Sequence, residues 1–209
     1  LPDPTWKQGA KGLPWFPGDS VNMGIGQGDL LATPLQMAVV AATLANRGRL
    51  VQPRMLRRID TPEQDDLQPL PPPAQIASEQ ITAEDWENMV ASLEDVVHLG
   101  NQGFRRNGTA WAYIGQDIDY RMAGKSGTAQ VVEIRQGEEY EEGTLAEFDR
   151  KHAWVIAFAP VENPTIALAV LVENGGGGSS VAGPVARAVL DAHMQKAKSA
   201  AQQEMVVQR

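Results

Sequence analysis

A lysine and two hydroxyl residues flank a single glycine in the run Lys125, Ser126, Gly127 and Thr128. Lys125 supplies a point charge, and the two hydroxyls supply directed hydrogen-bond donors. Gly127 has no side chain, so a ligand can approach the backbone there. Because side chains alternate along a strand, Ser126 and Thr128 point to the same side. The run predicts a compact anion receptor, although four such residues also occur in solvated turns.

Two glycine-rich segments have the composition of nucleotide-binding loops but not their spacing. Residues 24–28 (Gly-Ile-Gly-Gln-Gly) lack the preceding strand and the immediately following helix that the dinucleotide fingerprint requires. Residues 175–180 (Gly-Gly-Gly-Gly-Ser-Ser) lack the lysine of a phosphate-binding loop. We interpret the first as a tight backbone turn and the second as a flexible loop that leads to a helix near Pro184, whose backbone N–H groups could still contact an anion.

The chain has no cysteine, which excludes disulfides, thiolate nucleophiles and zinc sites built on sulfur. Its three histidines, His98, His152 and His193, have no histidine partner at helical metal-binding spacing. We therefore predict neither a metal site nor a cofactor. The net charge of −8, from 18 basic and 26 acidic residues, also argues against nucleic acid as a partner.

The apolar stretches of the chain are short, and its first residues do not resemble a signal peptide. No stretch reaches the ~18 residues that a membrane-spanning helix needs. The N-terminal residues have neither a basic start nor an apolar run, and no initiator methionine is present. We therefore expect these 209 residues to be part of a longer protein.

Local signals predict which elements position the receptor. Residues 1–32 are rich in Gly and Pro and are expected to form a loop. Thr33, Pro34 and Gln36 form a capping box that starts a helix, with Leu35 on its apolar face and Gly48 after its end. A short strand is expected at residues 51–59.

A second helix is expected from Thr82 to Gly100, followed by three strands at about residues 123–134, 153–159 and 166–172. A last helix begins near Pro184. Strands grouped together and followed by a helix indicate an α+β fold with an antiparallel sheet flanked by helices.

Three segments are expected to lie outside this packed body. They are a Pro-rich excursion at about 60–77, a mobile acidic loop at about 136–151 and a polar C-terminal tail at 196–209.

The order of the motifs resembles the penicillin-binding transpeptidases. Gly-Ile-Gly-Gln-Gly is followed by Thr-Pro-Leu-Gln-Met-Ala, then after about a hundred residues by Ala-Gly-Lys-Ser-Gly-Thr-Ala-Gln, and Glu-Asn-Gly-Gly follows the last strand. The Lys-Ser-Gly-Thr variant is most similar to the elongation-type, class B members of Gram-negative bacteria. The resemblance runs from about Trp6 to Met194. It implies that residues 1–195 are the C-terminal half of a transpeptidase domain with the serine β-lactamase-like fold.

The family's Ser-x-x-Lys motif, which carries the nucleophile, does not occur in the chain. Ser20 and Asn22 match the second motif, Ser-x-Asn, by letters, but they lie just before the Gly-Ile-Gly-Gln-Gly segment, whereas the family's motif lies well upstream of it. We therefore expect the nucleophile and general base to lie on a preceding segment. On that basis the chain alone is predicted to be inactive and to form no covalent penicillin adduct.

The resemblance implies roles for the residues of the receptor. The Thr128 N–H would be one donor of the oxyanion hole, and the hydroxyls of Ser126 and Thr128 would hold a terminal carboxylate. Lys125 would add positive potential. Gly127 would let a peptide lie along the strand edge, and Gln130 would make a secondary contact.

The implied reaction is the cross-linking of peptidoglycan stem peptides through a serine acyl-enzyme, inhibited by β-lactam antibiotics, during cell elongation. The implied location is the periplasmic face of the bacterial inner membrane, with a glycan polymerase of the elongation machinery as partner. Three alternatives remain: a penicillin-sensing domain, a β-lactamase of the same fold, and a non-catalytic scaffold piece.

Overall fold

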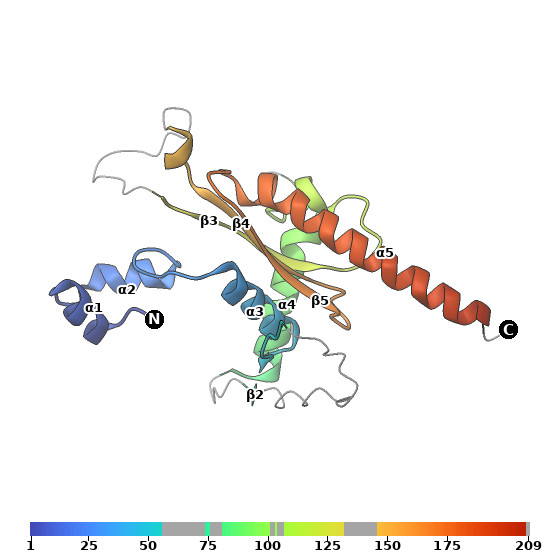
Figure 1. Cartoon of the computed structure of the whole chain (residues 1–209), viewed down its shortest axis with the longest axis horizontal. Coiled ribbons are helices and arrows are strands. Elements are labelled where there is room, and N and C mark those ends of the chain that lie inside the picture. The colour runs from blue at the N-terminus through green and yellow to red at the C-terminus, as the bar shows by residue number, and fades with distance from the viewer. Residues whose placement is uncertain (56–73, 76–80, 101–102, 104–106, 132–145, 208–209) are drawn as a thin grey trace, which may run out of the picture.

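Three antiparallel strands form the main sheet of this computed structural model, in the order β3-β4-β5 (Figure 1). They are β3 (Ala123–Ala129), β4 (His152–Ala159) and β5 (Ile166–Val172). All three expected strands are therefore present, but the first ends at Ala129; residues 130 and 131 are not strand, and 132–134 lie outside the described residues. The structure describes residues 1–55, 74–75, 81–100, 103, 107–131 and 146–207.

The described residues also form five α-helices and several short elements. The helices are α1 (Pro4–Lys11), α2 (Pro17–Gly24), α3 (Pro34–Ala45), α4 (Ala83–His98) and α5 (Gly183–Val207). The short elements are the π-helical turns η1 (Trp111–Gly115) and η4 (Gly178–Ala182), the 3-10 turn η3 (Glu147–Asp149), and the paired strands β1 (Arg49–Leu50) and β2 (Ala74–Gln75).

Helices pack against both faces of the main sheet. Val155 of β4 belongs to a buried cluster that includes Ala186 and Leu190 of α5. Phe158 points to the opposite face, where it packs with Ala45 of α3 and Val90 of α4. This arrangement confirms the predicted α+β fold, and it leaves β3 at one edge of the sheet.

Capping boxes start both α3, where the sequence predicts one, and α4, where it predicts only the helix start at Thr82. Thr33 Oγ1 accepts a hydrogen bond from the Gln36 N–H at 3.2 Å, and Gln36 Oε1 accepts one from the Thr33 N–H at 2.8 Å. Thr82 and Asp85 form the same reciprocal pair at the start of α4. Local side-chain chemistry is therefore sufficient to begin both helices at the predicted residues.

The prediction of a loop over residues 1–32 is wrong, because α1 and α2 lie within it. Pro4 and Pro17 occupy the first turns of these helices, where proline is tolerated. Asp3 caps α1 by accepting a hydrogen bond from the Trp6 N–H at 2.7 Å. The nearly buried Lys7 of α1 then pairs with Asp19 of α2.

Two other expectations differ from the structure. Leu35 is 60% exposed, whereas Ala41, Thr43 and Ala45 are the buried residues of α3. This helix is apolar on nearly all sides, so its sequence does not identify the buried face. Of the strand expected at 51–59, residues 51–55 form none, since the described pairing there involves only Arg49 and Leu50, and residues 56–59 lie outside the described residues.

The segments expected outside the packed body are described only in part. Of the excursion at 60–77, only β2 is described, and residues 136–145 of the expected acidic loop lie outside the described residues. The remainder of that loop contains η3. Helix α5 continues through position 196 to Val207, so the polar tail is helical over most of its length.

Candidate active site

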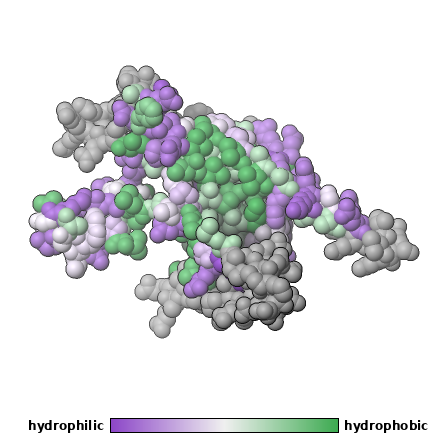
Figure 2. Space-filling view, viewed as in Figure 1, coloured by the Kyte–Doolittle hydropathy of each residue, from purple (hydrophilic) through white to green (hydrophobic). Residues whose placement is uncertain are grey.

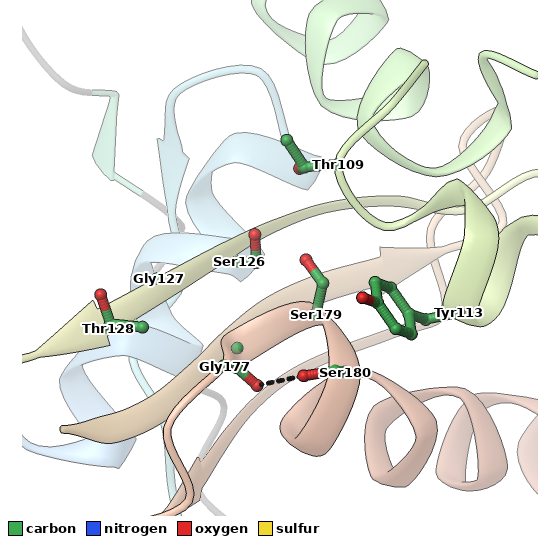
Figure 3. Close-up of a pocket in the computed structure, with 9 residues that line it drawn as sticks. Thr109, Tyr113, Ser126, Gly127, Thr128, Gly177, Ser179 and Ser180 are labelled. Carbon is green, nitrogen blue, oxygen red and sulfur yellow. Dashed lines mark hydrogen bonds between the residues drawn. The ribbon is translucent and has the colours of Figure 1, made fainter. Parts of the chain in front are cut away.

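The outer strand of the sheet forms one wall of an open hollow of about 380 Å³. Ser126, Gly127 and Thr128 of β3 line it (Figure 3). In the strand register, Ser126 pairs with Val155 and Thr128 with Ala153. Both hydroxyls therefore lie on the face of the sheet that α5 covers, as the alternation of side chains predicts.

The opposite wall comes from the glycine-rich connection between β5 and α5. Gly177, Gly178, Ser179 and Ser180 line this side. Gly178 lies directly against the sheet, where an added Cβ would be 2.5 Å from the Gly127 carbonyl oxygen and 2.6 Å from that of Trp154. The segment expected to be a flexible loop therefore includes η4, which is packed on the strand that carries the receptor.

Thr109 and Tyr113, from the segment before β3, complete the lining. Six hydroxyl side chains thus surround one hollow: Thr109, Tyr113, Ser126, Thr128, Ser179 and Ser180. None of the lining residues is charged. Hydroxyl donors suit a ligand with carboxylate and amide oxygens, because they satisfy these acceptors without a fixed counter-charge.

Sequence reasoning missed four of these hydroxyl residues. Thr109 and Tyr113 belong to no recognisable motif, and only the folding of η1 brings Tyr113 to the hollow. Ser179 and Ser180 directly follow the glycine run, and this position was the one available signal. Ser180 Oγ also donates a hydrogen bond to the Gly177 carbonyl at 3.3 Å, which holds the turn together.

Two predicted site residues do not line the hollow. The Lys125 ammonium group donates a hydrogen bond to the Ser126 carbonyl at 2.6 Å. Lys125 pairs with Ile156, so alternation places its side chain on the other face of the sheet from the Ser126 hydroxyl. Gln130 is exposed just beyond the end of β3. The structure therefore brings together Ser126, Gly127 and Thr128 from the predicted set.

The three histidines lie away from the hollow and accept or share structural hydrogen bonds. His98 Nε2 accepts one from the Met122 N–H at 3.0 Å, and His152 Nδ1 accepts one from the Asn174 N–H at 2.9 Å. His193 contacts the Thr165 hydroxyl at 3.0 Å. Burial lowers the pKa of His98, and the nearby Glu94 carboxylate opposes this shift only partly.

The part of the chain that the structure describes contains neither a cluster of metal ligands nor a membrane-spanning helix. No group of three or more His, Asp or Glu side chains lies close enough together there to hold a metal ion. None of the described helices is both long enough and apolar enough to cross a membrane. Ser20, from the misplaced Ser-x-Asn match, lies on α2, where its hydroxyl accepts a hydrogen bond from the Trp15 indole at 2.9 Å.

Comparison with curated proteins finds several related enzymes. The chain is 38% identical over 200 residues to peptidoglycan D,D-transpeptidase MrdA of Haemophilus influenzae, with 94% of this chain and 29% of that protein covered. It is 37% identical over 191 residues to MrdA of Escherichia coli K12, with 91% and 29% covered. The chain thus spans less than a third of the length of these relatives.

The chain is also similar to solved structures of PBP2 proteins. Pseudomonas aeruginosa PBP2 in complex with WCK 5153 matches with a TM-score of 0.71 and 38% identity, over 92% of this chain and 37% of that one. Helicobacter pylori PBP2 in complex with MreC matches with a TM-score of 0.63 and 30% identity, over 86% and 28%.

A family model described as the penicillin binding protein transpeptidase domain matches residues 2–191. This match includes the sheet, α3, α4, the first part of α5 and every residue that lines the hollow. The chain belongs to the penicillin-binding protein transpeptidase family.

Proposed function

We propose that the complete gene product is a serine-type peptidoglycan D,D-transpeptidase of cell elongation and shape maintenance, and a target of β-lactams. In this proposal, the present chain supplies the strand edge that receives the donor peptide. The observation that carries the proposal is the hollow beside β3, where Ser126, Gly127 and Thr128 face Ser179 and Tyr113 (Figure 3). A penicillin or a D-Ala-D-Ala peptide presents the carboxylate and amide oxygens that such a lining can bind.

The proposed reaction proceeds by two acyl transfers. A serine oxygen attacks the carbonyl carbon of the D-Ala-D-Ala peptide bond, and the C–N bond breaks to release the last D-Ala. An amine of a second stem peptide then attacks the serine ester and restores the hydroxyl. Since the 209 residues contain no Ser-x-x-Lys, we assign the nucleophile and general base to residues outside them.

In this reaction the β3 edge binds the donor. The hydroxyls of Ser126 and Thr128 donate hydrogen bonds to the terminal carboxylate, while the Thr128 N–H donates to the developing oxyanion. Gly127 leaves room for the peptide backbone. Lys125 contributes positive potential from the other face of the sheet. Gln130 contacts the peptide further along the strand.

The proposed partners and location follow from the relatives. The H. pylori neighbour was solved with MreC, so we propose that this protein also works within an elongation assembly, together with a glycan polymerase. Its site then faces the periplasm at the inner membrane. The relatives are named as D,D-transpeptidases, which does not favour the sensor or β-lactamase alternatives.

Covalent labelling with a fluorescent penicillin tests the proposal. We expect the complete gene product to carry one stable adduct per molecule and the 209-residue chain to carry none. Peptide mapping should place the adduct on a Ser-x-x-Lys serine. Rapid release of hydrolysed penicillin by the complete protein would instead indicate a β-lactamase, and failure to label would refute the proposed function.

A further inference from the structure

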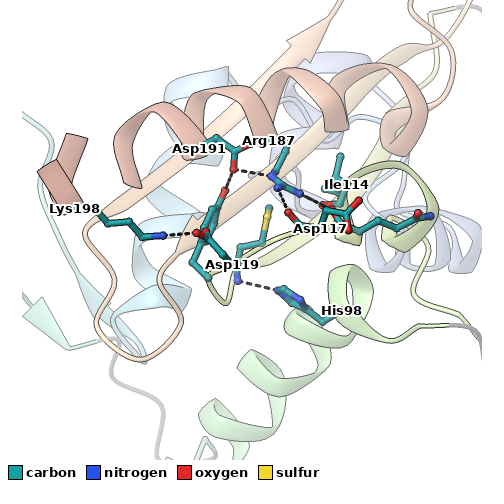
Figure 4. A network of polar contacts seen from close by, with 10 residues as sticks. His98, Ile114, Asp117, Asp119, Arg187, Asp191 and Lys198 are labelled. Atoms are coloured by element: carbon teal, nitrogen blue, oxygen red, sulfur yellow. Dashed lines mark hydrogen bonds and ion pairs between the residues drawn. The ribbon is translucent and has the colours of Figure 1, made fainter. Parts of the chain in front are cut away.

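Two walls of the hollow lie outside the sheet: one contains Tyr113 of η1, and the other contains Ser179 and Ser180 of η4. Arg187 of α5 connects them. Its guanidinium Nη1 donates hydrogen bonds to the carbonyls of Ile114 at 2.7 Å and Gln116 at 3.2 Å. Nη2 donates to the Asp117 carbonyl at 3.2 Å (Figure 4). These carbonyls lie in η1 and the residues directly after it, some seventy positions away in the sequence.

Both η1 and α5, which Arg187 joins, are continuous with residues that line the hollow. Ile114 follows Tyr113, which lines one side. On the other side, Ser179 and Ser180 lie in η4, which runs directly into α5. The spacing between the Tyr113 wall and the serine wall therefore depends on how η1 is fixed to α5.

The guanidinium is itself held in place. Its Nε donates to Asp191 Oδ1 at 2.7 Å, and the Tyr120 hydroxyl donates to the same oxygen at 2.7 Å. Burial, followed by the Asp191 hydrogen bond, raises the pKa of Tyr120 further above neutrality. The side chain of Arg187 is only 19% exposed. A planar fork can make all these bonds at once, and a lysine ammonium cannot.

We propose that Arg187 is a positioning residue that sets the distance between Tyr113 and the serine wall, and thereby the affinity of the hollow for a penicillin or donor peptide. This inference rests on the proposed function. Arg187 touches no reacting atom, so its effect is on binding of the ligand before the covalent step.

The test uses Arg187→Lys and Arg187→Gln in the complete gene product, with a fluorescent penicillin as the probe. Rapid-mixing kinetics separate the dissociation constant of the first complex from the acylation rate constant. We expect both variants to raise the dissociation constant about tenfold, because a small displacement of a binding wall weakens contacts. The acylation rate constant should stay within about twofold of wild type.

Lys198→Met is the matched control. Lys198 also lies on α5 and pairs with Asp119 of the same connecting segment, but it does not reach η1 (Figure 4). This variant should bind the probe as wild type does. Full affinity in Arg187→Lys would show that charge alone suffices and would overturn the proposal.

A double-mutant cycle with Tyr113→Ala tests the route of the effect. If Arg187 acts through the Tyr113 wall, Arg187→Lys should change the dissociation constant little once Tyr113 is truncated. Additive losses of affinity in the double variant would overturn the inference. So would thermal melts showing that the Arg187 variants lose stability to the same extent as they lose affinity. If wild type itself forms no adduct, the proposed function fails rather than this inference.

Discussion

In the proposed site Thr128 would offer a ligand two donors, its backbone N–H and its hydroxyl, and a valine removes only the second. In the complete gene product we expect Thr128→Val to lower the second-order rate constant of acylation by about 10- to 100-fold. This corresponds to loss of a hydrogen bond to a charged group, about 1.5–3 kcal/mol. Thr165→Val, an exposed threonine in the turn between β4 and β5, is the control and should acylate normally. Unchanged acylation in Thr128→Val would remove the hydroxyl from carboxylate binding.

His98 should make stability depend on pH. Burial lowers its pKa from the usual 6.5, so the folded protein holds a neutral ring while the unfolded chain takes up a proton. The stabilising contribution is complete above about pH 6.5 and is lost as the pH falls through the lower, folded-state pKa. Thermal melts at about pH 8 and about pH 5.5 should therefore show a smaller acid-induced drop for His98→Gln than for wild type.

The glutamine in that variant can still accept the Met122 N–H, which keeps the local hydrogen bond while removing the titration. If wild type and His98→Gln lost the same number of degrees on acidification, His98 would not be responsible for the pH dependence.

At the scale of elements, the hollow requires η4 to lie directly on the sheet. Gly178→Ala would place a Cβ 2.5 Å from the Gly127 carbonyl oxygen, so η4 or β3 must shift. We expect the free energy of unfolding to fall by about 1–3 kcal/mol, as for other overpacked sites, and penicillin binding to weaken. Chemical denaturation measures the first effect and probe binding the second.

Gly9→Ala is the matched control for this substitution. Gly9 lies in α1 with no other group within 4 Å of an added Cβ. Alanine should be neutral there or stabilise by up to ~1 kcal/mol, since glycine is a poor helix former. Equal behaviour of the two variants would mean that the contact between Gly178 and the sheet is not essential.

How well the elements could be predicted depended on whether their signals were local. Thr33 and Thr82 carry their capping partners three residues away, so the starts of α3 and α4 could be predicted. Pro4 and Pro17 suggested a loop, although proline also suits a first helical turn. The buried face of α3 depends on contacts with β4 and β5, and no periodicity within the helix indicates it.

The candidate site shows the same difference between residues with local signals and residues that only the fold brings together. Ser126, Gly127 and Thr128 are adjacent in sequence, so their common location followed from strand alternation. Tyr113 and Ser179 reach the hollow from separate segments, and only the assembled fold brings them to β3. The position of Lys125 also depends on the fold, because the sheet determines which face of β3 meets the hollow.

At the scale of the whole molecule, α5 has two apolar stripes. Ala186 and Leu190 form the inner stripe and are fully buried, as is Ala182 of η4 just before the helix. Val185 and Val189, each about half exposed, form an outer stripe with the same spacing of four. Figure 2 shows a continuous apolar area where β5 and the first turns of α5 lie in Figure 1. Among the described strands, none pairs with the outer side of β5.

Exposed apolar surface of this kind should bind a hydrophobic dye and promote association of the 209-residue chain. We expect Val185→Lys with Val189→Lys to reduce the fluorescence of bound anilinonaphthalene sulfonate and the sedimentation coefficient at high concentration. Lysine favours helix more than valine does, so α5 should persist. Ala188→Lys adds charge at an exposed position of the same helix while keeping both valines, and it should change neither measurement. Similar effects from all these lysines would instead point to general charge repulsion, because only the valines contribute to the outer stripe.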